Sequence, residues 1–152
     1  MSHQLINQDT INIYCDGGAR GNPGPAASAF VVKDQSGRIV HQQGVFLGTA
    51  TNNQAEYQAV IESLNWILNN RSTVQQINYY LDSLLVVNQL NGVYKIKDPT
   101  LKLKHLKTKN SIDKLLAQGE AGRKKLKFSY TPRNNNFLAD KLVNETLDKT
   151  LL

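Results

Sequence analysis

The sequence predicts an α/β fold in which helices pack on one mixed β-sheet. Apolar and polar residues alternate in three consecutive stretches before residue 50, and strand-like and helix-like patterns alternate after it. Apolar content is 40% and charged content is 20%, values typical of a globular domain, and no apolar run is long enough to cross a membrane. We therefore expect a single domain over residues 1–152, with five strands in the order βββαβααβα.

The first third of the chain predicts an antiparallel meander. Residues 10–16 alternate in polarity and end at Asp16, which predicts the first strand. Strands are also predicted over residues 27–34 and 37–48, because the DQSG between them is typical of a hairpin turn. The stretch CDGGARGNPGPA, rich in glycine and proline, predicts the turn between the first two strands.

The middle of the chain predicts a helix, a strand and a short helix. Apolar residues recur at helical spacing over residues 51–70, and Thr51 with Gln54 matches the capping-box pattern that marks a helix start. Residues 75–83 predict the fourth strand, with Asp82 at its C-terminal end. The short helix SLLVVNQLNG follows and ends where glycine stops it.

The last third predicts a basic helix, a strand and a final helix. After the connector VYKIKDP, a helix is expected from about Thr100 to Ala117, and GEAGR breaks it. Residues 126–133 predict the fifth strand. Asn136 is expected to cap the last helix, which carries an apolar face formed by Ala139, Leu142, Val143 and Leu147.

The charge is distributed unevenly along the chain. Residues 1–92 hold four basic and six acidic residues, a net −2, whereas residues 93–152 hold fourteen basic and six acidic residues, a net +8. A basic half favours a polyanionic partner, most simply nucleic acid, although a solubilising lysine surface explains it equally well. The lysines concerned are Lys95, Lys97, Lys102, Lys104, Lys107, Lys109, Lys124, Lys125 and Lys127.

The N-terminal segment and the cysteine content bear on the cellular setting. Cys15 is the one cysteine, so the chain forms no internal disulfide, which suits a reducing compartment. The start, MSHQLINQDT, lacks the basic and apolar regions of a signal peptide. We expect a cytoplasmic monomer without a membrane partner.

Four acidic residues stand at the ends of predicted elements. Asp16 and Asp82 end strands, Glu56 lies in the first turns of the long helix, and Asp140 lies one turn into the last helix. If these ends adjoin, the carboxylates converge and repel, so they need a cation or raised pKa values. Oxygen ligands suit Mg²⁺ or Mn²⁺, and two such ions can cleave a phosphodiester. Taken singly, each acid could instead serve a helix dipole or begin a helix.

At these residues the sequence resembles type 1 ribonuclease H. The likeness covers about residues 10–148 in several ordered segments, namely YCDGGARGNPGPAASAFVV, TNNQAEYQAVIESL, LDSLLVVNQLNG, YKIKDPTL and TPRNNNFLADKLVNETL. The resemblance implies a ribonuclease H-like fold and metal-dependent endonucleolytic cleavage of the RNA strand of an RNA/DNA hybrid. The products would carry 5′-phosphate and 3′-hydroxyl ends.

The resemblance also implies residue roles. The metal-binding carboxylates of the family fall on Asp16, Glu56, Asp82 and Asp140, and two Mg²⁺ ions are expected, with Mn²⁺ as a substitute. Contacts with the minor groove of the hybrid fall on Asn22, Asn52 and Asn53, whose amides can donate to and accept from the 2′-hydroxyl. Further expected substrate contacts are Gly17, Gly18, Gln54, Ser83, Arg133, Lys95 and Lys97.

The chain departs from the family pattern in two places. Many members carry a histidine in the last loop, but TPRNNNFLAD has none, so no proton-transfer residue is assigned. Only VYKIKDP stands where many bacterial members have a basic handle, so we expect no handle, and we expect no accessory hybrid-binding domain before Asp9.

Three other functions fit parts of the pattern. A non-catalytic module binding RNA/DNA hybrid or double-stranded RNA is the first alternative, but a pure binder has no need to collect acids near phosphates. Another nuclease of the same wider fold, such as a junction resolvase or exonuclease, is less favoured by TNN and DGGARGNPGP. A plain structural domain would leave the ordered likeness to chance.

Overall fold

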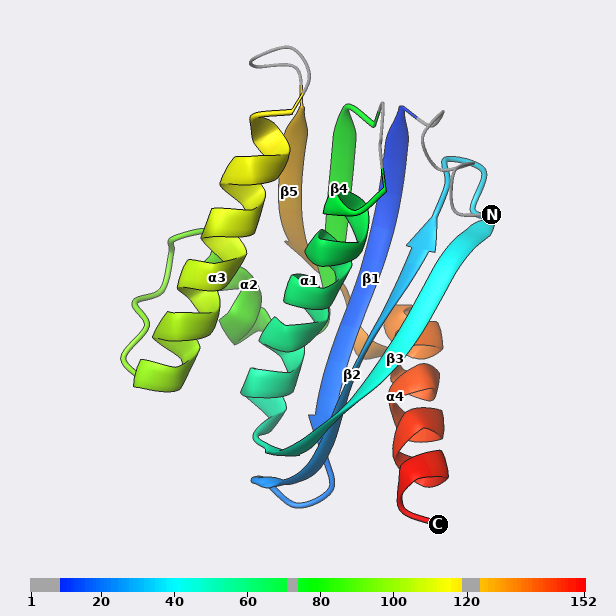
Figure 1. The fold of residues 1–152 in the computed structure, drawn as a ribbon, viewed down its shortest axis with the longest axis vertical. Helices are drawn as coiled ribbons and strands as arrows, with labels where there is room; N and C mark the ends of the chain where they lie inside the picture. Colours follow the sequence, from blue (N-terminus) through cyan, green and yellow to red (C-terminus); the bar gives the residue numbers. More distant parts are fainter. Residues whose placement is uncertain (1–8, 71–73, 119–123) are drawn as a thin grey trace.

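The computed structural model describes residues 9–70, 74–118 and 124–152, and these form a five-stranded mixed sheet with helices on both faces (Figure 1). The predicted break GEAGR lies outside the described residues. The strands are β1 (Thr10–Ala19), β2 (Gly24–Lys33), β3 (Ile39–Ala50), β4 (Gln76–Leu81) and β5 (Lys125–Tyr130). Their order across the sheet is β3-β2-β1-β4-β5, with β1 antiparallel to β2 and parallel to β4. The predicted fold class is confirmed.

The helices divide between the two faces of the sheet. They are α1 (Asn52–Leu68), α2 (Leu84–Leu90), α3 (Pro99–Leu116), the 3₁₀ turn η2 (Arg133–Asn136) and α4 (Phe137–Thr150). The main core joins α1, α2 and α3 to one face, to which β2 contributes Phe30 and Val32. A smaller core joins α4 to the opposite face, to which β2 contributes Ala27 and Ala29. Figure 1 shows α1 and α3 side by side and α4 beside β2 and β3.

The first hairpin is longer than the sequence predicts. β1 continues to Ala19 and β2 begins at Gly24, and Gly17, Gly18 and Ala19 pair with Ser28, Ala27 and Ala26. Backbone ladder bonds need no side chain, so the glycines remain in the strand despite their low strand propensity. Only residues 20–23 turn, with Gly21 at φ +83°. The expectation that Asp16 ends the strand is therefore wrong: Asp16 lies inside β1.

Helix starts follow the predicted chemistry with one exception. The capping box of α1 is confirmed, because Gln54 N donates to Thr51 Oγ1 at 3.1 Å and Thr51 N donates to Gln54 Oε1 at 3.0 Å. Asp98 caps α3 by accepting from Thr100 N at 2.8 Å. Asn136 occupies the position before α4, but its side chain makes no capping bond and is used elsewhere. Within the described residues, no helix is both long and apolar enough to cross a membrane.

Candidate active site

The parallel pairing of β1 and β4 places two carboxylates at one edge of the sheet. The last parallel pair is Cys15 with Leu81, and the residues that follow on the two strands are Asp16 and Asp82. Ligand sites in sheets of this kind tend to lie beyond the carboxyl ends of parallel strands. Asp16 thus occupies the predicted place, although β1 continues beyond it on β2 alone.

Glu56 comes from the second turn of α1, which lies very close to β1. A Cβ atom built on Gly17 would lie 2.2 Å from the carbonyl carbon of Ala55, so this position requires glycine. The close approach lets Gly17 N donate to Glu56 Oε1 at 3.2 Å. The structure thus gives Gly17 a packing role in addition to the substrate contact predicted for it.

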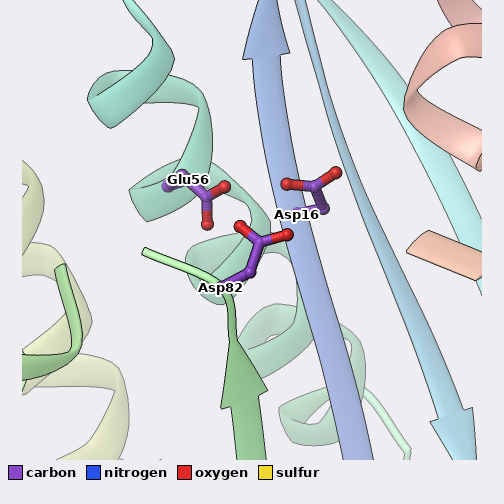
Figure 2. A group of neighbouring side chains, drawn as sticks. All are labelled: Asp16, Glu56 and Asp82. Atoms are coloured by element: carbon purple, nitrogen blue, oxygen red, sulfur yellow. The ribbon is translucent and has the colours of Figure 1, made fainter. Parts of the chain in front are cut away.

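Asp16, Glu56 and Asp82 form one cluster, and Figure 2 shows their carboxylates pointing toward one another. Each offers an oxygen, and these oxygens all lie within 4.8 Å of one another. Asp16 and Glu56 are 6% and 4% exposed. Buried like charges at this separation favour either protons or a bound cation.

The pKa values of two carboxyls in the cluster are raised, as expected for crowded and buried acids. Burial raises the pKa of Asp16 to about 7, and the charges of Asp82 and Asp140 add to the rise. Burial, and then the charge of Asp16, raise the pKa of Glu56 well above its ordinary value. Oε2 of Glu56 is buried without a hydrogen-bond partner among the described residues. A divalent cation would offset the repulsion between the carboxylates and would give this oxygen a ligand partner.

Asp140 lies in the same cavity but apart from the three-residue cluster. It lines a cavity of about 440 Å³ together with Asp16, Glu56, Asp82 and Arg133. Asp140 Oδ1 accepts from Arg133 Nη2 at 3.3 Å, and this bond raises the pKa of Arg133. The side chain of Arg133 is 80% exposed, so its other donors face the cavity mouth and solvent.

Asn136 is a residue of the site that the sequence reasoning assigned only to helix capping. Its Nδ2 donates to Cys15 O at 2.8 Å and to Asp82 Oδ2 at 3.4 Å, and the residue is 1% exposed. Asn136 thereby ties η2 to β1 and to the residue that follows β4, and it orients Asp82. The sequence distinguishes Asn136 from Asn134 and Asn135 only as a possible helix cap, and no local pattern indicates its contact with Asp82.

The turn after β1 is fixed to the start of α1 by two asparagines. Asn22 Oδ1 accepts from Asn52 N at 2.9 Å, and Asn52 Oδ1 accepts from Ala19 N at 2.8 Å. Both residues are exposed, and among the described residues their Nδ2 groups have no partner. Arg20 fixes the other side of the turn through an ion pair with Asp148 on α4, at 2.6 Å.

The remaining predicted polar contacts lie around the same edge. Asn53 is half-buried on α1. Gln54 uses Oε1 in the capping box, and Ser83 Oγ accepts from Val86 N at 3.3 Å to cap α2. Gly18 lines the cavity, where the nearest atom to an added Cβ would be Val143 Cγ1 at 3.7 Å.

Comparison with known proteins identifies the family. The family model for RNase H matches residues 8–148. The chain belongs to the RNase H family. It is 37% identical over 138 residues to a ribonuclease HI of Halobacterium salinarum, with 91% of this chain and 64% of the relative covered. It is 36% identical over 140 residues to a bifunctional protein of Mycobacterium tuberculosis, with 91% of this chain and 35% of the relative covered. The chain thus spans less than two thirds of these curated relatives.

Solved RNase H structures share the fold over nearly the whole chain. The RNase H1 of Halobacterium salinarum has a TM-score of 0.80 and 36% identity, covering 92% of this chain and 98% of that one. LC11-RNase H1, crystallised with an RNA/DNA hybrid, has a TM-score of 0.83 and 40% identity, covering 93% and 99%. These likenesses support the type 1 form of the RNase H fold.

The lysines of this RNase H domain divide into three groups. Lys95 and Lys97 are exposed on the connector between α2 and α3, as predicted for a phosphate contact. Lys104 donates to Gln58 Oε1 at 2.8 Å, and Lys124 donates to Val74 O at 2.6 Å and is buried, so both ammonium groups are bonded within the chain. A nucleic-acid contact at these two lysines stays a prediction.

The third group, Lys125 and Lys127 on β5, lies away from α3. Leu126 and Phe128 of β5 face the main core, and alternation along the strand therefore places Lys125 and Lys127 on the opposite face of the sheet. The sheet thus separates Lys125 and Lys127 from α3.

Proposed function

We propose that this chain is a divalent-metal-dependent endoribonuclease that hydrolyses the RNA strand of RNA/DNA hybrids, leaving 5′-phosphate and 3′-hydroxyl ends. The observation that carries the proposal is the convergence of three carboxylates, from β1, α1 and the end of β4, in a cavity at the edge of the sheet. Membership of the RNase H family supports it, as does the hybrid bound by LC11-RNase H1.

The donor set fits Mg²⁺, with Mn²⁺ as a substitute. The cluster offers only carboxylate oxygens, which are the ligands that hard cations prefer. Oε2 of Glu56, which has no hydrogen-bond partner among the described residues, could be one of these ligands. Asp16, Glu56 and Asp82 would hold the metal, and Asp140 would be the fourth carboxylate when two ions are present. When bound, such ions activate water and stabilise the leaving oxygen of a phosphodiester.

The chain's own residues position the substrate phosphate and set the charge of the site. Arg133, held beside the carboxylates by Asp140, presents an exposed guanidinium that can donate to a phosphate oxygen. Asn136 keeps Asp82 oriented through its amide. Burial raises the pKa of Asp16 to about 7, so a cation bound at this carboxyl would compete with a proton near neutral pH.

The asparagines at the turn provide a means of recognising RNA. The oxygens of Asn22 and Asn52 are fixed by backbone donors, which leaves both Nδ2 groups oriented and available. A 2′-hydroxyl displayed in a wide minor groove can accept from such a donor, and DNA has no counterpart. Asn53 lies one helical turn before Glu56, so an RNA strand contacted at Asn53 would run toward the carboxylates.

The exposed lysines of the connector and of α3 would bind the phosphates flanking the cleavage site. Lys95 and Lys97 are joined in this by Lys102, Lys107 and Lys109, all exposed. Each phosphate neutralised makes affinity more salt-dependent, so binding of a hybrid should fall steeply as salt rises.

We also propose that the domain acts as a monomer in a reducing compartment such as the cytoplasm, where the buried free thiol of Cys15 stays reduced.

A substrate panel tests the proposed activity. Labelled RNA/DNA hybrid, double-stranded RNA, single-stranded RNA and double-stranded DNA would be incubated with the protein in Mg²⁺, Mn²⁺ or EDTA. We expect cleavage of the RNA strand of the hybrid alone, only with a metal, and with 5′-phosphate at the new ends. Hybrid binding without cleavage in either metal would instead support a non-catalytic binding module.

A further inference from the structure

The part of the sheet formed by β4 and β5 has one face against which no described helix packs, and β1 borders it. In the described residues, α4 packs against β1, β2 and β3. Figure 1 shows this helix beside β2 and β3, away from β5. The pairing registers place two rows of side chains on this side of the sheet, Lys33–Asn12–Asn78–Lys127 and, next to it, Val31–Tyr14–Tyr80–Ser129. Val31, at the β2 end of the second row, is buried.

The second row contains a pair of stacked aromatic rings. The rings of Tyr14 and Tyr80 lie 5.0 Å apart between centroids at an interplanar angle of 20°, and both residues are half-buried. Lys33 Nζ lies 5.1 Å from the centroid of Tyr14. Among the described residues, Tyr14 is the one ring stacked on Tyr80, and the neighbour of Tyr80 on β5 is the small Ser129. A flat group stacked on the other side of Tyr80 would lie over this small side chain.

A third aromatic side chain lies at the end of this face nearest the carboxylates. Phe137, at the start of α4, is 61% exposed, although a phenylalanine normally buries its ring. Together with Tyr14, Lys33 and Asn136 it lines a small cavity of about 20 Å³. Aromatic side chains thus run from the middle of the open face to η2, half-buried at Tyr14 and Tyr80 and exposed at Phe137.

The open face carries positive charge and no acid among the side chains of its rows. Lys125 and Lys127 are exposed on β5, and Lys33 stands at the other end of the first row. Between them, Asn78 Nδ2 donates to Asn12 Oδ1 at 3.1 Å, and Gln76 Nε2 donates to Asn78 Oδ1 at 2.8 Å. An amide network framed by lysines and flanked by aromatic rings suits a ligand that combines flat bases with phosphates.

We propose that this open sheet face is a second nucleic-acid site, separate from the carboxylate cavity, and that it binds single-stranded nucleic acid. A base stacks on the other side of Tyr80, over Ser129, and Lys127 and Lys125 contact the phosphates on either side. The stacked ring of Tyr14 and then Phe137 extend the row of aromatic side chains from Tyr80 toward η2. The proposal does not rest on the catalytic assignment, because the site contains none of the four carboxylates.

Fluorescence anisotropy in EDTA tests the proposal, with a labelled oligothymidine of about ten nucleotides as the probe. Lys127→Glu, on an exposed position that leaves the core intact, should weaken binding and lower the slope of log affinity against log salt by about 0.7 for each phosphate that is no longer neutralised. Tyr80→Ala should weaken binding roughly five- to hundredfold. The matched control is Lys114→Glu, an equal charge change on exposed α3, and it should bind as wild type does.

Cleavage of a hybrid in Mg²⁺ should be unchanged in Lys127→Glu, which separates this site from the catalytic one. The proposal is overturned if the wild-type chain does not bind the oligothymidine, or if Lys114→Glu weakens binding as much as Lys127→Glu. It is also overturned if sedimentation shows that Lys127→Glu dissociates a dimer while oligothymidine binding stays unchanged, since a second copy of the chain then occupies the face.

Discussion

Replacing Gly17 by alanine would place a methyl group against the backbone of α1. The new Cβ would lie 2.2 Å from the carbonyl carbon of Ala55 and 2.4 Å from Glu56 N. Carbon atoms in contact prefer about 3.5–4.0 Å, so α1 would have to move from β1 by more than about 1 Å. The obstacle is backbone and cannot rotate away. We expect a loss of about 3 kcal/mol, the upper part of the range for overpacked cores.

Thermal unfolding followed by circular dichroism measures this loss. About 3 kcal/mol corresponds to a fall in Tm of roughly 6–12 °C for a domain of this size. Gly18→Ala is the matched control, because the nearest atom to its Cβ is 3.7 Å away, and it should change stability by less than about 0.5 kcal/mol. If Gly17→Ala melts with the wild type, α1 does not approach β1 as described.

The same substitution should lower catalysis, because Gly17 N donates to Glu56 Oε1 and α1 carries Glu56. A displacement of about 1 Å in a catalytic group can cost about a hundredfold in rate. A folded Gly17→Ala fraction, assayed well below its Tm, should therefore cleave hybrid about a hundredfold more slowly. Unchanged cleavage in that fraction would show that the position of Glu56 does not matter.

Three further substitutions test the cap of α1, the orientation of Asp82 and the raised pKa of Asp16. Thr51→Ala removes the capping box of α1 and should cost about 0.5–2 kcal/mol in denaturant unfolding, whereas Thr150→Ala, at the far end of α4, should cost less. Asn136→Ala releases Asp82 and should slow hybrid cleavage roughly 10- to 100-fold while the required Mg²⁺ concentration rises; an unchanged metal requirement would argue against an orienting role. In EDTA the unfolding free energy should fall as the pH rises from about 5.5 to about 7, because a carboxyl whose pKa is raised in the folded state favours the fold less once it loses its proton. Asp16, with its pKa of about 7, contributes about 2 kcal/mol of this decline and Glu56, whose pKa is also raised, adds to it, so Asp16→Asn should make the decline smaller, and an equal decline in that variant would assign it to other groups.

Patterns within single elements were enough to predict most of the fold. Alternating polarity and turn residues located the five strands, and the Thr51–Gln54 pair located the start of α1 to the residue. The length of the first hairpin was not predictable in this way. Gly17 and Gly18 are poor strand residues, and they stay in β1 because β2 supplies hydrogen-bond partners.

Placing side chains between elements was harder. The positions of the acids indicated a cluster only on condition that the element ends adjoin, and the resemblance to type 1 ribonuclease H pointed to the same residues. The parallel pairing of β1 and β4 supplies that adjacency for Asp16 and Asp82. The role of Asn136 depends on the contact between η2 and β1, which no local pattern encodes. The lysines were grouped by sequence distance alone, yet Lys104 and Lys124 bond to other elements, and strand alternation places Lys127 on the far face of the sheet.

The central claim is that the three-carboxylate cluster performs metal-dependent cleavage of hybrid RNA. The most direct test is the initial cleavage rate of an RNA/DNA hybrid, measured against Mg²⁺ concentration for wild type, Asp82→Asn and the control Asp113→Asn, an exposed acid on α3. Removing a metal ligand should lower the cleavage rate at least as much as removing a residue that orients a ligand. The initial rate of Asp82→Asn should therefore be lower than that of the wild type by at least about a hundredfold. Asp113→Asn should match the wild type. Equal cleavage by wild type and Asp82→Asn, or cleavage that persists in EDTA, would contradict the account.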